Sequence, residues 1–373
     1  PSSMLRKANT QKNQCYLNIF IVKKMKREIF YNDAIKEALE TSLKKDRSVI
    51  VLGLGVDDPK GIFGTTLNLH KKFNKNVFDM PTAENTFTGI SLGLATKGFK
   101  PVIVHQRVEF SLLSVEQIIN QIAKWHYMSA GKVKISITIR LIIGKGWGQG
   151  PQHSQSLEVL FAHIPGLKVV CPSTPSDAKG MLIESIFDKN PVIFFEHRWL
   201  HSTKGHVPKE SYKKDISKSK IVKKGNDISI VSYSYSLIEC LKAHKILREK
   251  FNVNVQVLDL RVLRPLDKKT ILRSLKKTTK ILVVDNGMKT FGIAAEISAL
   301  VNEKYKNKYT IKRLGVEETP IPSTISLAKY CYPESTLIVE ECLKLLGKKY
   351  SKKMLPKEKK YLDQPDKDFV GPF

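Results

Sequence analysis

Short apolar runs alternate with stretches of helical periodicity through the first part of the chain. The helical pattern over 29–44 precedes an apolar run at 48–55, and similar runs follow at 77–80, 101–104, 134–144, 167–171 and 191–196. Helical patterns lie between them at 84–98, 114–128 and 177–187. Strands that alternate with helices of this length favour a mostly parallel, doubly wound α/β sheet.

A second series of the same kind follows a polar, Lys/Ser-rich segment. Apolar runs at 227–234, 253–261, 280–286 and 310–316 predict strands, and helical patterns cover 236–249, 267–276, 291–304 and 335–347. The chain therefore divides into an extension (1–24) before Met25, a first α/β domain (25–201), a linker (202–226), a second α/β domain (227–348) and a basic tail (349–373). The tail is expected to cover a surface or partner or to stay mobile.

Composition narrows the class of protein. The 373 residues carry a net charge of +28, but the lysines are spread along the chain and form no recognisable nucleic-acid module. Five cysteines without CxxC spacing favour reduced thiols in the cytoplasm. No apolar run is long enough for a membrane span, and the short run at 15–22 lacks a cleavage site. We expect neither a nucleic-acid nor a membrane partner.

One stretch, 80–98, places a single acid at the start of an otherwise apolar helix. Thr82 is the expected N-cap of this helix and Glu84 lies in its first turn. Its apolar and small positions, expected to press against a neighbour, are Phe87, Gly89, Ile90, Gly93 and Leu94. Interior glycines destabilise a helix by roughly 1 kcal/mol each, which favours a packing or cofactor-approach requirement. An acid that only complements the helix dipole is the alternative interpretation.

Common catalytic and phosphate-binding motifs are absent. The sequence has no GxGxxG after a strand, no GxxxxGK[ST], no HExxH and no GxSxG, and the glycine-rich loop at 144–150 precedes QHSQ rather than an expected helix start. Glu84, Phe110 and His153 remain as candidates, because all three are expected near strand ends of the first domain. Ordinary packing or surface roles are the alternative for Phe110 and His153.

Several long segments nevertheless have a familiar order. These segments are DMPTAENTFTGISLGLATKGFKPV (79–102), QIINQIAKWHYMSAGK (117–132), GPQHSQSLEVLFAHIPGLKVVCPSTPSDAKG (150–180), DKNPVIFFE (188–196) and VLDLRVLRPLD (257–267). Through them the chain resembles the beta subunit of the thiamine-diphosphate-dependent decarboxylating component of 2-oxo acid dehydrogenase complexes, such as pyruvate dehydrogenase. The resemblance implies a pyrimidine-binding domain followed by the transketolase C-terminal domain.

The resemblance also implies roles for particular residues. Glu84 matches the glutamate that hydrogen-bonds a ring nitrogen of the cofactor's aminopyrimidine and promotes loss of a proton from the thiazolium carbon. Phe110 matches an apolar residue beside the pyrimidine, and His153 matches a histidine that faces the substrate. A potassium ion bound in some relatives maps onto Ile137, Ser185, Asp188 and Asn190.

Half of the cofactor site is missing from the sequence. In this family a GDG motif and a downstream asparagine hold the diphosphate and magnesium, and the chain contains no GDG. The resemblance therefore implies an alpha subunit that carries this half, an assembly of two alpha and two beta chains, and a lipoyl acyltransferase as a further partner. An acidic partner would also match the +28 charge.

The chain departs from the family pattern at three places. Leu54 and Gly55 stand where two acids are usual, while His105, Arg107, His197 and Arg198 are expected to add positive charge around the substrate entrance. Three functions stay open. The first is oxidative decarboxylation of a pyruvate-like 2-oxo acid with acyl transfer to a lipoyl group, for which the added charge suggests an anionic or unusual substrate. The others are a transketolase-like carboligation without lipoyl and a non-catalytic basic binding subunit.

Overall fold

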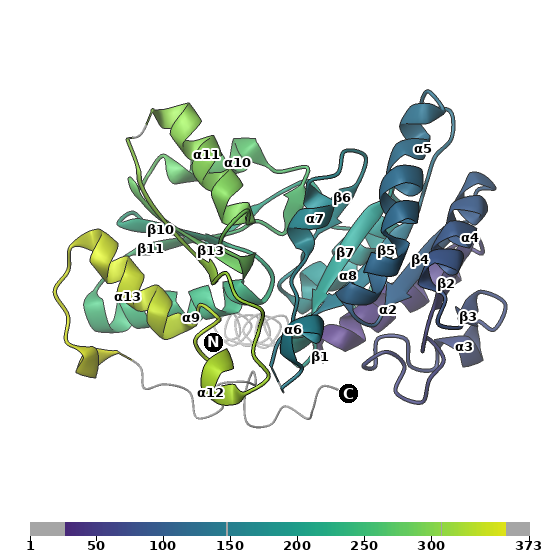
Figure 1. Cartoon of the computed structure of the whole chain (residues 1–373), viewed down its shortest axis with the longest axis horizontal. Helices are drawn as coiled ribbons and strands as arrows, with labels where there is room; N and C mark the ends of the chain where they lie inside the picture. The colour runs from purple at the N-terminus through teal and green to yellow at the C-terminus, as the bar shows by residue number, and fades with distance from the viewer. Residues whose placement is uncertain (1–26, 147, 307, 356–373) are drawn as a thin grey trace, which may run out of the picture.

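The computed structural model describes residues 27–146, 148–306 and 308–355. Figure 1 shows two α/β domains side by side, the first in purple to teal on the right and the second in green to yellow on the left. Each domain is built on a mostly parallel sheet with helices packed against it. The predicted fold class is confirmed.

A seven-stranded sheet forms the first domain. Its strand order is β12-β6-β7-β5-β4-β2-β3, and all neighbours are parallel except β12 against β6. The strands are β2 (Val49–Gly53), β3 (Val77–Asp79), β4 (Lys100–His105), β5 (Thr138–Ile143), β6 (Lys168–Val170), β7 (Val192–His197) and β12 (Val262–Arg264). The helices are α2 (Tyr31–Lys45), α3 (Leu69–Lys72), α4 (Glu84–Thr96), η1 (Val108–Ser114), η2 (Gln117–Ile122), α5 (Ala123–Met128), α6 (Gly150–His153), α7 (Glu158–Ala162), α8 (Pro175–Ile186) and η3 (Arg198–Leu200).

The second domain has a five-stranded sheet of order β14-β13-β10-β11-β9. Only β9 runs antiparallel to its neighbour in this sheet. The strands are β9 (Lys220–Lys223), β10 (Ile228–Ser232), β11 (Val255–Asp259), β13 (Lys280–Met288) and β14 (Thr310–Val316). The helices are α9 (Ser234–Phe251), α10 (Lys268–Leu275), α11 (Ile293–Tyr305), α12 (Ile325–Ala328), α13 (Ser335–Leu346) and η4 (Lys352–Met354).

Burial on both faces explains why the strands of the first sheet are almost continuously apolar. In β2, Val49 and Val51 belong to the core shared with α2 and α8, whereas Ile50 and Leu52 belong to the opposite core under α4. Successive strand side chains point to opposite faces, so one run of apolar residues fills both layers.

Two short strands lie inside the segment 202–226, where the sequence predicts only a linker. Strand β8 (Lys204–His206) pairs with β1 (Glu28–Phe30) at the start of the first domain, and β9 joins the second sheet. Strand β12 was also not predicted. It follows β11 of the second domain in the chain but pairs with β6 at the edge of the first sheet. The two domains are therefore joined by backbone pairing as well as by side-chain packing.

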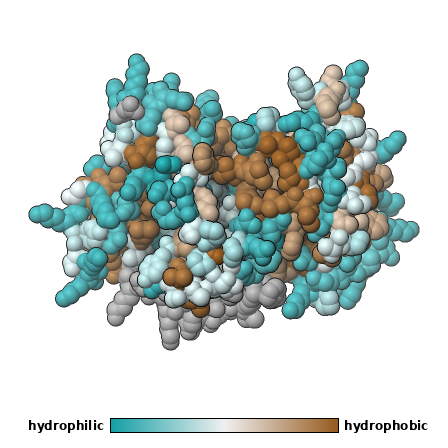
Figure 2. All heavy atoms as spheres, viewed as in Figure 1, coloured by the Kyte–Doolittle hydropathy of each residue, from teal (hydrophilic) through white to brown (hydrophobic). Residues whose placement is uncertain are grey.

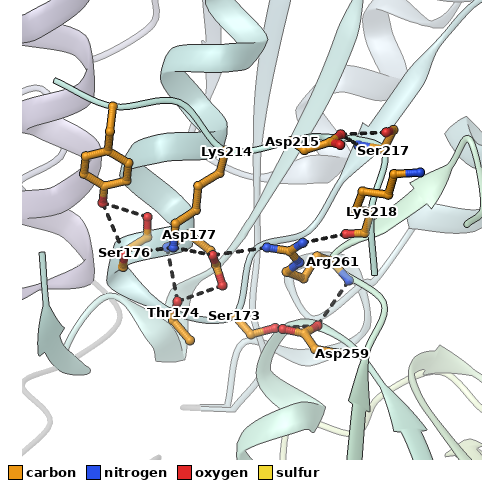
Figure 3. Close-up of polar contacts among 11 residues, drawn as sticks. Ser173, Thr174, Ser176, Asp177, Lys214, Asp215, Ser217, Lys218, Asp259 and Arg261 are labelled. Atoms are coloured by element: carbon orange, nitrogen blue, oxygen red, sulfur yellow. Dashed lines mark hydrogen bonds and ion pairs between the residues drawn. The ribbon is translucent and has the colours of Figure 1, made fainter. Parts of the chain in front are cut away.

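A buried ion cluster lies beside this crossing (Figure 3). Asp177 Oδ1 accepts hydrogen bonds from Lys214 Nζ at 2.7 Å and from Arg261 Nη1 at 3.3 Å. Arg261 also donates from Nη2 to the Lys218 carbonyl at 2.8 Å, and its backbone N–H donates to Asp259. Asp177 belongs to the first domain and Asp259 to the second, so this cluster ties the domains together.

Some predictions fall outside the described residues. The extension 1–24, Cys15 and most of the basic tail lie there. Within the described ranges, Cys171, Cys240, Cys331 and Cys342 are free thiols. No helix in those ranges is both long and apolar enough to cross a membrane.

Candidate active site

Three neighbouring strands of the first sheet end beside one another. Strand β5 lies between β4 and β7, and all three run parallel, so the residues that follow them meet at the carboxyl edge of the sheet. These residues are Arg107 after β4, Gly144 after β5 and Arg198 after β7. A cavity of 620 Å³ opens at this edge, and its lining residues are Asp58, Lys60, Ile62, Phe63, Gln106, Arg107, Phe110, Gly148, Gln149 and His153.

Two of the predicted residues share this cavity. The rings of Phe110 and His153 pack edge to face with their centres 6.1 Å apart. His153 lies in the one-turn helix α6 rather than in a loop, because the chain turns into a helix directly after the glycine-rich segment. The prediction that this segment does not lead into a helix was wrong.

Glu109 is a residue whose role the sequence analysis missed. Its Oε1 pairs with Nδ1 of His153, and the Glu109 side chain is only 10% exposed. The carboxylate accepts, so Nδ1 carries the proton and Nε2 is left for other partners. Its position next to Phe110, one residue earlier in the same 3₁₀ helix, was the available signal.

Glu84 lies apart from this pair. It is the first residue of α4 and is 4% exposed, and among the described residues its carboxylate makes no hydrogen bond or ion pair. No hydrogen bond or ion pair joins it to Phe110 or His153 within the described part of the chain, although α4 packs against η1, which carries Phe110. The N-cap position is held by Ala83 without a side-chain cap, so the prediction of Thr82 as the cap was wrong.

The outer face of α4 differs from the prediction. A Cβ added at Gly93 would meet nothing within 4 Å, and one at Gly89 would be 3.4 Å from Gln117, an ordinary contact. Ile90 is 48% exposed. These residues therefore do not press against another part of the described chain, and only the Phe87 face of α4 is buried in the core.

Gln106 explains the departure at Leu54 and Gly55. Its amide Nε2 donates to the Leu54 carbonyl at 3.0 Å, and a Cβ at Gly55 would lie 2.1 Å from the same nitrogen. Gly55 also has a φ of +76°, where residues other than glycine are strained. The side chain of Gln106 thus fills the space that a larger residue at position 55 would need.

Two of the four predicted cationic residues are not charged. His105 is buried against Phe87, and burial lowers its pKa to about 3. Burial and then Lys145 lower the pKa of His197 well below its usual range, and His197 accepts a hydrogen bond from the Trp199 backbone. Both imidazoles are neutral at pH 7. The prediction that they add positive charge was wrong because their burial could not be recognised from the sequence.

The two arginines do lie close together at Phe63, a lining residue of the cavity, and Arg107 lines the cavity as well. The guanidinium of Arg198 lies 4.4 Å from the Phe63 ring centre, and that of Arg107 lies 5.8 Å from the same ring. Burial, and then the nearby Arg107, lower the pKa of Arg198 to about 10. Gly144 makes room for both, because a Cβ there would lie 3.0 Å from Arg198 Cβ and 3.2 Å from Arg107 Nη1.

Comparison with known proteins places this arrangement in a family. Residues 27–202 match the transketolase pyrimidine-binding domain and residues 217–336 match the transketolase C-terminal domain. The chain is 36% identical to the beta subunit of acetoin:2,6-dichlorophenolindophenol oxidoreductase from Cupriavidus necator, over 86% of this chain and 98% of that protein. It is 38% identical to a pyruvate dehydrogenase E1 beta subunit from Gracilaria tenuistipitata, over 83% and 97% respectively. The chain is a beta subunit of the thiamine-diphosphate-dependent 2-oxo acid dehydrogenase family.

A solved structure supports the fold of this beta subunit. The chain is similar to a split-gene transketolase described as an inactive beta4 tetramer, with a TM-score of 0.72 and 19% identity over 86% of this chain and 99% of that chain. At this identity the likeness extends to the fold alone.

Thiamine diphosphate fits the beta subunit at Glu84. A carboxylate that is almost fully buried and has no polar partner in the described chain is suited to an N–H donor brought by a ligand. The described residues contain no group of three or more His, Cys, Asp or Glu side chains that could hold a metal ion. The residues present therefore fit the aminopyrimidine end of the cofactor and not its magnesium diphosphate end.

Polar groups of the expected potassium loop form hydrogen bonds within the chain. Asp188 Oδ1 accepts from the backbone N–H of Asn190 at 2.9 Å, and its Oδ2 pairs with Lys168 Nζ at 2.5 Å. Ser185 Oγ donates to the Met181 carbonyl, and the Ile137 carbonyl accepts from the Val192 N–H. The four residues lie near one another at the amino ends of β5 and β7, away from the edge that carries His153.

Proposed function

We propose that this beta subunit works with an alpha subunit to decarboxylate a 2-oxo acid and to pass the acyl group to a lipoyl group. The observation that carries the proposal is the buried Glu84 carboxylate, which has no polar partner in the described chain, at the start of α4 in the pyrimidine-binding domain. Relatives of this chain are named for pyruvate and for acetoin. Pyruvate is a 2-oxo acid, whereas acetoin is a hydroxyketone without a carboxyl group, so the pyruvate name is the precedent for this reaction.

The side chains divide the work. When bound, thiamine diphosphate supplies the nucleophilic carbon for the carbonyl of the 2-oxo acid. Glu84 holds the aminopyrimidine through a hydrogen bond at its carboxylate. Phe110 shields one side of the cavity from water. His153, held at Nδ1 by Glu109, presents Nε2 to exchange a proton with the substrate or the acyl acceptor.

An exposed apolar surface beside the site supports an alpha partner. Figure 2 shows apolar residues gathered right of centre on the face in view. The 3₁₀ helix η1, which carries Phe110, also exposes Leu112 at 41% and Leu113 at 64%, and it packs against α4, where Ile90 is exposed. A chain that covers this surface would border the cavity and could bring the magnesium and diphosphate ligands.

The assembly we propose has two alpha and two beta chains and serves a lipoyl acyltransferase. Potassium at the loop of Ile137, Ser185, Asp188 and Asn190 belongs to the same proposal, with backbone carbonyls as the main ligands. The ion would hold the ends of β5 and β7 and take no part in the reaction.

The test uses the complex with an alpha subunit encoded in the same genome. Decarboxylation is followed across a panel of 2-oxo acids, with and without a lipoyl domain, for wild type and Glu84→Gln. We expect activity to require both chains and to fall by at least about 10²-fold in the variant. Glu249→Gln, an exposed acid on α9 of the second domain, is the control and keeps wild-type rates.

Two results would contradict the proposal. Equal activity of wild type and Glu84→Gln would remove Glu84 from the reaction. Turnover that is independent of the lipoyl domain would show a carboligating enzyme instead.

A further inference from the structure

Arg107 is buried without the partners that a guanidinium normally has. The residue is 5% exposed, and its Nη1 and Nη2 atoms are buried and make no hydrogen bond within the described chain. A buried cation without a counter-ion destabilises a folded protein, so such an arrangement is kept where something else supplies the missing charge.

The surroundings of Arg107 are built to keep it in place. Its guanidinium lies over the Phe63 ring, and the absence of a side chain at Gly144 leaves the space that Nη1 occupies. Arg198 also packs against Gly144 and lies over the Phe63 ring, so it adds a second positive charge there. Residues from three strand ends and one loop thus fix a cation at the edge of the sheet.

Two carboxylates lie nearby, and neither forms an ion pair with Arg107 within the described residues. Asp58 lines the same cavity, but its Oδ1 accepts from the backbone N–H groups of Lys60 and Gly61 at 2.7 and 2.5 Å. Glu109 pairs with His153 through Oε1, and its Oε2 is buried without a hydrogen bond. Burial lowers the pKa of Arg107 and the charge of Glu109 offsets this only in part, and the two residues form no ion pair in the described chain. An anion in direct contact with the Arg107 guanidinium therefore has to come from outside these residues.

The cavity sets where that anion would sit. Arg107 and Lys60 line the same 620 Å³ space as Phe110 and His153. A ligand whose reacting carbonyl is served by His153 would thus extend toward two cations. The volume is enough for a small molecule, and positive lining groups select a negative one.

We propose that Arg107, aided by Lys60, binds a second anionic group on the substrate, so that this subunit prefers a 2-oxo acid with a carboxylate or phosphate at its far end. The inference rests on the proposed function. It makes Arg107 a specificity-determining residue and predicts poor use of pyruvate. The chemical group that Arg107 would recognise is an oxyanion, which the second carboxylate of a dicarboxylate, a phosphonate or free phosphate could provide.

The test compares substrates that differ only in the far group. In the complex with the alpha subunit, kcat/KM is measured for 2-oxoglutarate and for 2-oxopentanoate, which has the same carbon chain without the second carboxylate. We expect wild type to favour 2-oxoglutarate over 2-oxopentanoate. In a parallel experiment it should favour 3-phosphonopyruvate over pyruvate. The ratio of kcat/KM for the charged substrate to that for the uncharged one expresses this preference. In Arg107→Met this ratio should fall on the order of 10²-fold, mainly through KM. Arg107→Lys should restore part of it, and the exposed Arg248→Met should keep the wild-type ratio.

Binding gives a readout that does not need turnover. Titration calorimetry on the same complex uses glutarate, pentanoate and inorganic phosphate as probes. Glutarate should bind to wild type and not to Arg107→Met, while pentanoate binds weakly to both.

The other outcomes distinguish failure of this inference from failure of the proposed function. If some 2-oxo acid is decarboxylated but charged substrates have no advantage and Arg107→Met behaves as Arg248→Met, the inference fails and the proposed function stands. Binding of inorganic phosphate through Arg107 without any preference among substrates would assign the site to free anions and overturn the substrate role. If no 2-oxo acid is decarboxylated, the proposed function fails, and the glutarate titration still decides whether Arg107 binds an anion.

Discussion

Two of the places where the described chain buries arginines differ in their surroundings. At the domain junction, Arg261 is 8% exposed and donates to Asp177 and to the Lys218 carbonyl, with Lys214 on the same carboxylate (Figure 3). At the carboxyl edge of the first sheet, Arg107 is 5% exposed and has an aromatic ring and open cavity around it. Arg261 forms an ion pair with a carboxylate of the chain, whereas Arg107 forms none within the described residues.

The difference separates a structural role from a binding role. A buried ion pair with its hydrogen bonds made holds two domains in one arrangement, and loss of either partner leaves a costly buried charge. A buried cation without an ion-pair partner does not stabilise the fold in this way while no ligand is bound. Asp177, Lys214 and Arg261 form the junction cluster, which should therefore control stability. Arg107 and Arg198 form the edge cluster, which should control substrate selectivity.

The largest effect is expected at Asp177. Replacement by alanine leaves Arg261 and Lys214 without their shared carboxylate and should lower the free energy of unfolding by about 3–5 kcal/mol, measured by urea denaturation. The control is Glu184→Ala, whose partner Lys213 is 45% exposed, and a loss below about 1 kcal/mol is expected there. Equal losses in the two variants would erase the contrast between the clusters.

The same cluster predicts a direction for the pH dependence. Burial opposes ionisation of Asp177, but Lys214 and Arg261 outweigh it and lower the pKa. A carboxyl with a lowered folded pKa stabilises the fold above its unfolded pKa of about 4, and this contribution is lost as the pH falls through the folded pKa. Wild type should therefore lose more stability than Asp177→Ala on acidification below about pH 4.

A smaller effect, on activity rather than stability, is expected from Glu109→Gln. The variant keeps an acceptor near His153 Nδ1 but removes its charge, so kcat should fall by about 10- to 10²-fold with little change in KM. The double variant with His153→Gln should be no slower than His153→Gln alone, because the two residues act as a unit. Additive losses, or a fall in stability like that of Asp177→Ala, would give Glu109 a different role.

The strands with continuous apolar sequence were predictable, and the three short strands β8, β9 and β12 were not. Strands β4 and β7 read as buried runs because both faces are covered. Strands β8, β9 and β12 have three or four residues each and consist largely of Lys, Gly, Val and Arg. Their pairing depends on partners far along the chain, which local patterns do not contain.

The environment of the candidate site was less predictable than the position of its residues along the chain. The sequence offered Glu84, Phe110 and His153 as candidates, and the structure brings the last two together. It could not show that His105 and His197 are buried and neutral while Arg107 reaches a cavity, because all three lie at or just beyond the end of a strand. Tertiary packing decides which of them stays charged.

The smallest effect is expected from Gly144→Ala, and it tests whether the edge cluster depends on space. The added Cβ would lie 3.0 Å from Arg198 Cβ, which is fixed near the backbone, and 3.2 Å from Arg107 Nη1, which can move. We expect a loss of roughly 1 kcal/mol in unfolding free energy and a several-fold lower preference for charged substrates, since Arg107 would be displaced first. Gly89→Ala, whose Cβ would make only an ordinary contact on α4, should stabilise the chain by up to about 1 kcal/mol through helix propensity and leave the preference unchanged. An unchanged substrate preference in Gly144→Ala would mean that the position of Arg107 does not depend on this opening, and that the two arginine clusters differ in their partners but not in how tightly they are held.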